Sequence, residues 1–249
     1  MSEFIAILTS TEIILGVITF LTSVIAAVVG IGGGMMLIAI LPSFLPLNAL
    51  IPVHGLTQVS SNISRAFFGY KDIQYEVIPK FLIGSVLGIG LFAGVLSFIS
   101  LEYVPLFIEV YILLSLWSEK FNEKIKRYEN YYLAGFFQTG LSMVVGATGP
   151  LTMTLLFKDY EDKDKVVATG AALMSITHLL KVVVFIYFGF VFFDFIWIIV
   201  AMIFGAVFGS FVGTKARNLI DGKKFTIILK TLLTILAIKL IVDIIIKVI

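Results

Sequence analysis

Cysteine is absent from the 249-residue chain, and charged side chains make up only 14% of it. Without cysteine there are no disulfides, no thiolate nucleophiles and no Cys-ligated metal ions. The formal net charge of +2 is too small and too dispersed to indicate a nucleic-acid partner. The two histidines are far apart and have no nearby carboxylates, so no metal site and no cofactor is predicted.

Polar surface is also scarce, because 59% of the residues are hydrophobic and the mean hydropathy is +1.08. A soluble domain of this size needs more polar residues than this sequence supplies. Crossing a hydrocarbon core takes roughly 20 helical residues, and unbroken runs such as 196–208 and 227–240 are typical of helices rather than barrel strands. The sequence predicts an all-α membrane protein, a polytopic helical bundle in the cytoplasmic membrane with the lipid bilayer around it.

The apolar runs predict the positions of the helices along the chain. Glu3 stands where a cleaved leader would carry basic residues, so the first run is expected to be a retained helix. The predicted helices cover residues 8–29, 34–47, 48–70, 78–100, 102–118, 131–146, 150–158, 165–191, 195–215 and 225–248.

An internal repeat divides the chain into residues 1–118 and 131–249, joined by a polar stretch at 119–130. The motif VVGIGGG at 28–34 aligns with VVGATGP at 144–150. On the same register Ser61-Asn62 meets Thr177-His178, and Arg65 meets Lys181. Several matches at fixed spacing indicate duplicated transmembrane repeats.

Loop charge predicts the orientation of these repeats. The connections at 71–80, 120–127, 158–165 and 215–224 are basic, whereas those near Leu47, Ser100 and Asp194 lack Lys and Arg. Placing every basic connection in the cytoplasm, including a connecting loop at 119–130, puts both termini outside and inverts one repeat relative to the other. About six crossings are expected, with the two glycine-centred pairs either re-entrant or fully spanning.

Each repeat contains a glycine-rich break. The first holds Gly32, Gly33 and Gly34, and consecutive glycines cost roughly 1 kcal/mol each inside a helix relative to Ala. The second holds Thr148 and Gly149, followed by a proline that favours the first turn of a new helix. A helix that begins at such a break offers free N–H groups and a positive dipole end to an anion.

The alternative reading of these glycines is close packing between helices. For Gly84 and Gly88, and for the aligned Gly205, Gly209 and Gly213, packing is the favoured interpretation because no polar residues accompany them.

The third helix of each repeat carries a polar stripe on one face. In the first repeat it contains His54, Gln58, Ser61, Asn62 and Arg65. In the second it contains Thr177, His178 and Lys181. Ionisable groups in membrane spans usually face a bundle interior or a water-filled pathway.

Several roles stay open for these residues. Arg65 could bind an oxyanion in bidentate fashion or snorkel to the headgroups. Lys181 lies deeper in its helix, where binding is favoured. His178 could contact substrate, carry a proton or only pack. Gln138, Thr139 and Ser142 could line the same cavity or hydrogen-bond helix to helix.

No enzymatic constellation is found. The apolar spans contain almost no carboxylates to complete a hydrolytic triad, and no GxxxxGK[ST] motif is present for ATP. The sequence therefore predicts a protein that is not an enzyme.

The duplicated pattern resembles the TauE/SafE family of sulfite exporters and related anion permeases. The resemblance is carried by residues 28–94, from VVGIGGG to GLFAG, and by a degenerate copy at 135–221. It implies movement of sulfite, sulfonates or other small sulfur-containing anions across the cytoplasmic membrane, coupled to an ion gradient. It also maps Gly32 to Gly34, Asn62, Thr148 to Pro150 and His178 onto the duplicated motif.

Together these patterns predict a secondary transporter that binds a small anion, sulfite above others, between its repeats and works by alternating access. An anion channel is one alternative, and a membrane-embedded accessory or sensor protein that binds an anion without transport is another. The sequence leaves open the substrate, the direction, the coupling ion (a proton or another) and whether two copies form a homodimer.

Overall fold

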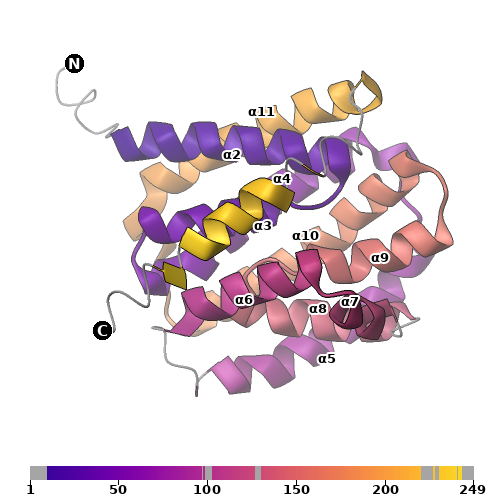
Figure 1. Ribbon diagram of the computed structural model, residues 1–249, viewed down its shortest axis with the longest axis horizontal. Helices are drawn as coiled ribbons and strands as arrows, with labels where there is room; N and C mark the ends of the chain where they lie inside the picture. The colour runs from indigo at the N-terminus through magenta and orange to yellow at the C-terminus, as the bar shows by residue number, and fades with distance from the viewer. Residues whose placement is uncertain are drawn as a thin grey trace.

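The computed structural model describes residues 10–96, 98, 103–126, 130–219, 227, 230–239 and 241–242. Within these residues the chain is a bundle of helices without a strand, which confirms the predicted all-α membrane fold (Figure 1). The α-helices are α2 (Ser10–Val29), α3 (Gly33–Ile40), α4 (Leu50–Phe68), α5 (Ile78–Leu96), α6 (Val104–Trp117), α7 (Glu119–Lys126), α8 (Tyr131–Val145), α9 (Gly149–Asp159), α10 (Lys163–Tyr187) and α11 (Ile196–Ala216). Short 3-10 turns connect them: η1 (Leu41–Ser43), η2 (Leu47–Ala49), η3 (Tyr70–Asp72), η4 (Tyr75–Val77), η6 (Phe192–Phe195) and η7 (Arg217–Leu219).

Two predicted segments differ from the structure. The expected helix at 34–47 ends at Ile40, because Pro42 and Pro46 lack the N–H groups that would continue it. The expected loop at 119–130 contains α7, whose Phe121 packs against the apolar core. Within the predicted helix at 225–248 the structure describes residues 227, 230–239 and 241–242, all of them helical, and the other residues lie outside the described part of the chain.

Four described helical segments are long and apolar enough to cross a membrane, namely Thr11–Val29, Tyr75–Gly94, Lys163–Tyr187 and Phe192–Ala216. The segments Gly33–Ser43 and Val104–Trp117 are apolar but shorter. Although α4 has 19 residues, it is not among the four, because its polar stripe lowers its hydropathy. The number of crossings and their orientation stay predictions.

Glycines bring two pairs of helices into backbone contact. A Cβ atom at Gly84 or Gly88 of α5 would collide with carbonyl oxygens of α8. One at Gly205, Gly209 or Gly213 of α11 would collide with carbonyl oxygens of α2. In Figure 1, α2 and α11 run together along one edge of the bundle, and α5 lies with α8 at the opposite edge. The packing interpretation of these glycines is confirmed.

The polar helices α4 and α10 pack together between these two pairs, and α4 also contacts α11. On their facing surfaces the rings of His54 and His178 lie 5.7 Å apart, edge to face. The polar stripes predicted for the third helix of each repeat therefore meet inside the bundle.

The predicted alignment makes α2 equivalent to α8 and α5 equivalent to α11. Each tightly packed pair therefore combines one helix from each half of the sequence. Pairing between helices of the two halves is expected for a duplicated architecture. The inverted orientation of the halves stays a prediction.

The connections after α4 and α9 also join the halves. The hydroxyl of Tyr160 donates to Oε1 of Glu76 at 2.8 Å, and the Gln74 N–H donates to Oγ1 of Thr169 at 2.9 Å. Burial and the hydrogen bond to Glu76 raise the pKa of Tyr160 to about 12. The phenol thus keeps its proton at neutral pH and remains a donor.

Candidate functional site

Both glycine breaks interrupt the helical backbone as predicted. Between α2 and α3 the chain passes through Gly32 at φ 91°, and after α8 it passes through Gly146 at φ 75°. These left-handed angles strain any residue with a Cβ, so glycine is required at both turns. The two breaks approach the same pocket from different helices.

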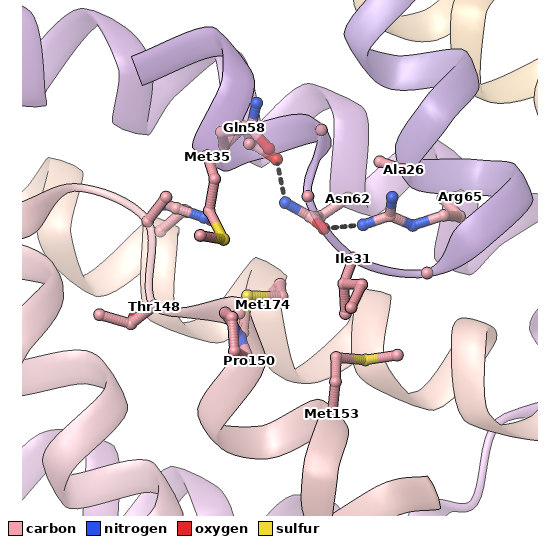
Figure 2. A pocket seen from close by; sticks show the side chains of 17 residues that line it. Ala26, Ile31, Met35, Gln58, Asn62, Arg65, Thr148, Pro150, Met153 and Met174 are labelled. Carbon is pink, nitrogen blue, oxygen red and sulfur yellow. Dashed lines mark hydrogen bonds between the residues drawn. The ribbon is translucent and has the colours of Figure 1, made fainter. Parts of the chain in front are cut away.

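This pocket encloses a cavity of about 40 Å³. Figure 2 shows its 17 lining residues, drawn from both breaks and from α4 and α10. They are Ala26, Gly30, Ile31, Gly32, Gly33, Gly34, Met35, Gln58, Asn62, Arg65, Ala147, Thr148, Gly149, Pro150, Met153, Met174 and His178. At 10 to 15 Å³ per water, the cavity has room for roughly three waters. It therefore suits an ion of a few heavy atoms.

Arg65 provides the one charged side chain in the lining. It is 4% exposed, so it does not reach the bundle surface, which excludes snorkelling. Its Nη2 donates to Oδ1 of Asn62, and Nδ2 of Asn62 donates to the backbone carbonyl of Gln58 at 2.7 Å (Figure 2). Within the described part of the chain, Nε and Nη1 of Arg65 have no hydrogen-bond partner. Two buried cationic donors thus remain available beside the pocket.

Backbone donors add to this positive character. The N-termini of α3 and α9 both lie in the lining. No side chain caps α3, whereas at α9 Pro150 has no N–H and Gln138 accepts from the Thr152 N–H, so α3 offers most of the free backbone donors. The first N–H groups of a helix have no intrahelical acceptor, and the dipole is positive at that end. Gly33 and Gly34 place such groups at the pocket without a Cβ to cover them.

The two histidines lie at the same junction. Nε2 of His54 donates to the carbonyl of Gly34 at 2.9 Å, because a carbonyl can only accept. His178 lines the pocket, and its Nδ1 is buried without a partner among the described residues. His54 therefore supports the first break, while His178 forms part of the pocket lining.

Three of the predicted site residues do not line the pocket. Nζ of Lys181 donates to the carbonyl of Gly146 at 2.7 Å. Ser61 hydrogen-bonds Ser23 of α2 at 3.0 Å. Thr177 lies 3.1 Å from the hydroxyl of Thr139, within a network between α8 and α10. The other nine, Gly32, Gly33, Gly34, Gln58, Asn62, Arg65, Thr148, Gly149 and His178, are all in the lining.

A family model described as "Sulfite exporter TauE/SafE" matches residues 15–240, which is nearly the whole chain and includes every residue of the pocket. The chain belongs to the TauE/SafE family. No curated protein and no solved structure matches it. The TauE/SafE family is one of membrane transporters of sulfite and related anions, in keeping with the absence of an enzymatic constellation in the sequence.

Sequence reasoning missed the apolar part of this TauE/SafE pocket. Met35, Met153 and Met174 lie around the cavity in Figure 2. Met174 lies one helical turn before His178, so the period of the polar stripe could have pointed to it. Met35 and Met153 follow the two breaks, and no local pattern separates them from ordinary core residues.

Gln138 does not line the pocket but fixes the second break. Its backbone carbonyl accepts from Oγ1 of Thr148 at 2.8 Å, and its Oε1 accepts from the Thr152 N–H at 3.1 Å. Its Nε2 donates to Thr177 at 3.2 Å. Of the two interpretations of this polar group, the structure supports hydrogen bonding between helices.

Proposed function

We propose that this chain is a secondary transporter that binds a small oxyanion, sulfite or a related sulfur-containing anion, in the pocket between the two glycine breaks. The observation that supports this most directly is Arg65, whose Nε and Nη1 are buried without a partner among the described residues, beside the uncapped N-terminus of α3. Charged donors left unsatisfied in a protein interior are costly, and an anion would satisfy them.

The chemistry of the lining favours an anion over a cation or a neutral solute. It contains one guanidinium group and no carboxylate. A guanidinium group offers charged N–H donors in fixed directions to an oxyanion. Nη2 of Arg65 donates to Asn62, which fixes the orientation of the group, and Nε and Nη1 are the donors left for an anion.

The size of the cavity favours a compact anion. A space of about 40 Å³ holds roughly three waters, which is comparable to an ion of four or five heavy atoms. The three methionine side chains around it are flexible and can adapt to small differences in anion shape.

The position of the pocket favours alternating access. It lies where α3 and α9 begin, between two helix pairs that each pack through backbone contact. Tight pairs of this kind move as units, so the breaks and the pocket between them are where relative movement would be absorbed. The site would then open first to one side of the cytoplasmic membrane and then to the other.

Uptake of labelled sulfite into proteoliposomes, with and without an imposed pH gradient, tests this proposal. We expect saturable uptake by the wild type and a loss of about 10- to 100-fold in Arg65→Gln, because charged hydrogen bonds contribute about 1.5–3 kcal/mol. Arg65→Lys, which keeps the charge but loses the fork, should lie between them. Lys71→Gln removes an exposed cation outside the pocket and should transport within about twofold of wild type.

Other outcomes would favour the alternatives. Flux that never saturates and never accumulates against a gradient would indicate a channel. Binding of sulfite, sulfate, thiosulfate and methanesulfonate without any flux would indicate an accessory or sensor protein. Undiminished flux in a folded Arg65→Gln variant would contradict the proposed site.

A further inference from the structure

A second buried ionisable group lies outside the pocket, on α6. The side chain of Glu109 is 0% exposed, and neither Oε1 nor Oε2 has a hydrogen-bond partner among the described residues. The flanking Ile108 and Ile112 belong to the main apolar core. A side chain that faced lipid would be exposed on the outer surface of the bundle. Glu109 is not exposed, so it lies inside the protein rather than against the bilayer.

Among the side chains that the structure describes, no cation on the elements around α6 pairs with this carboxylate. α6 packs against α3, α7 and α8, and its Trp117 donates to Thr234 of the C-terminal segment at 2.8 Å. α3 has no ionisable residue, and α8 has only tyrosines. The described titratable groups on these elements and on α6 itself are Tyr111, Glu119, Lys120, Glu123, Tyr131, Tyr132, Lys230 and Lys239.

None of these groups forms an ion pair or hydrogen bond with Glu109. The charged side chains of Glu119, Lys120 and Glu123 are exposed on α7. Lys230 lies over the ring of Trp117, with Nζ 5.9 Å from the ring centroid, and Lys239 is exposed. The carboxyl group of Glu109 is therefore buried beside the apolar core and has no partner among the described side chains.

The position of α6 connects this group to the pocket. α6 packs against both α3 and α8. α3 begins at the first glycine break, and α8 ends at the second. The two helices that adjoin the breaks thus both pack against the helix that carries Glu109, so a movement at the breaks would be felt by α6.

We propose that Glu109 is the proton-binding site of this protein and that it couples anion transport to proton transport in the same direction. The inference rests on the proposed function. The step is a simple proton transfer: the carboxylate takes a proton from hydronium on one side of the membrane, leaving water, and returns it to water on the other side.

Electrostatics decides the direction of coupling. An ionised Glu109 and a bound anion are like charges within one low-dielectric bundle, and each disfavours the other. Protonation of Glu109 therefore favours anion binding, and by linkage anion binding favours protonation. The anion-bound protein therefore also holds a proton on Glu109, so one proton and one anion cross the membrane together.

Methanesulfonate is a suitable probe because it stays ionised throughout the neutral range, so a pH gradient cannot act on the probe itself. Proteoliposomes are first tested for exchange of labelled for unlabelled methanesulfonate at equal pH. They are then tested for accumulation with the exterior one pH unit more acid and the membrane potential clamped at zero. Coupling of one proton to one anion sets a limit of about tenfold accumulation in the wild type.

Glu109→Gln keeps the size of the side chain and resembles the protonated form. We expect it to exchange methanesulfonate within about twofold of wild type, yet to accumulate less than twofold under the gradient. Glu123→Gln removes a carboxylate from the exposed face of α7 and should accumulate as the wild type does.

The outcomes separate this inference from the proposed function. If the wild type exchanges none of the four anions tested above, the proposed function fails. If it exchanges methanesulfonate but Glu109→Gln accumulates as well as wild type, the role of Glu109 is overturned. If accumulation needs an acid interior, the direction of coupling is overturned. If methanesulfonate is not exchanged but sulfite is, the same comparison is made with sulfite after subtraction of the signal from protein-free vesicles.

Discussion

At the scale of single residues, two cations fix the ends of the helices that precede the breaks. Nζ of Lys181 donates to the carbonyl of Gly146, just beyond α8. Nε of Arg217 donates to the carbonyl of Ala27 in the last turn of α2, at 2.8 Å, while its Nη1 pairs with Asp164 at 2.6 Å. Cations suit the negative end of a helix, so both residues stabilise the backbone that enters a break.

Lys181→Met tests this supporting role. Met has nearly the same length but cannot donate, so the buried carbonyl of Gly146 loses its partner. We expect a loss of about 1–3 kcal/mol in the free energy of unfolding, because that is the usual cost of an unsatisfied buried group. Thermal unfolding in detergent would measure it.

The same variant distinguishes a structural role of Lys181 from direct binding of the anion. Lys181 does not line the pocket, so sulfite affinity should fall less in Lys181→Met than in Arg65→Gln, measured on the folded fraction. Lys71→Met controls for the loss of a charge at an exposed position. A variant of Lys181 that unfolds as wild type but no longer binds sulfite would show that the lysine contacts the anion directly.

At the scale of helices, α5 contains two glycines with opposite environments. A Cβ at Gly88 would collide with the carbonyl of Phe136 in α8, whereas a Cβ at Gly90 meets nothing within 4 Å. The pair allows the packing of α5 on α8 to be separated from the intrinsic helix preference of the residue.

We therefore expect Gly88→Ala to lower the melting temperature and Gly90→Ala to leave it unchanged or raise it. Both substitutions gain helix propensity of about 1 kcal/mol, but only the first forces two backbones apart. Thermal melts of the two purified variants would decide between them. Equal melting temperatures would mean that α5 and α8 can separate at no cost.

Much of the helical pattern could be predicted from the sequence because long apolar runs and glycine breaks are local signals. The limits of α8, α9 and α11 agree with prediction to within one residue. By contrast, α7 was expected to be loop, because its polar composition outweighs the apolar contact that Phe121 makes with the core.

The site was predictable only in part, for a similar reason. Arg65, Asn62 and Gln58 share a helical face, so their convergence follows from spacing alone. Whether an aligned cation reaches the pocket depends on tertiary packing, and Lys181 instead bonds the backbone. Glu109 was overlooked because an isolated carboxylate in an apolar run has no local pattern, and its significance lies in its burial without a partner among the described residues.

At the scale of the whole molecule, α4 is held mainly by elements that follow it in the chain. Its polar face contacts α10 and α11, with Ser61 accepting from Ser210 through its backbone carbonyl at 3.0 Å. Its tip is joined through the η3 and η4 connection to the α9–α10 region. The most polar of the long helices is therefore enclosed by the second half of the chain.

This enclosure has a consequence for biogenesis. A helix that is too polar to partition into lipid by itself is stable in the membrane only when neighbouring helices cover its polar face. We therefore expect α4 to insert stably only after α10 and α11 have been synthesised. In the cysteine-free chain, Ser60→Cys can report this through labelling with a membrane-impermeant maleimide. We expect labelling when translation stops at residue 118 and protection in the full-length protein. Protection in the truncated chain would mean that the first half inserts into the membrane on its own. The second half would then pack against helices that are already inserted.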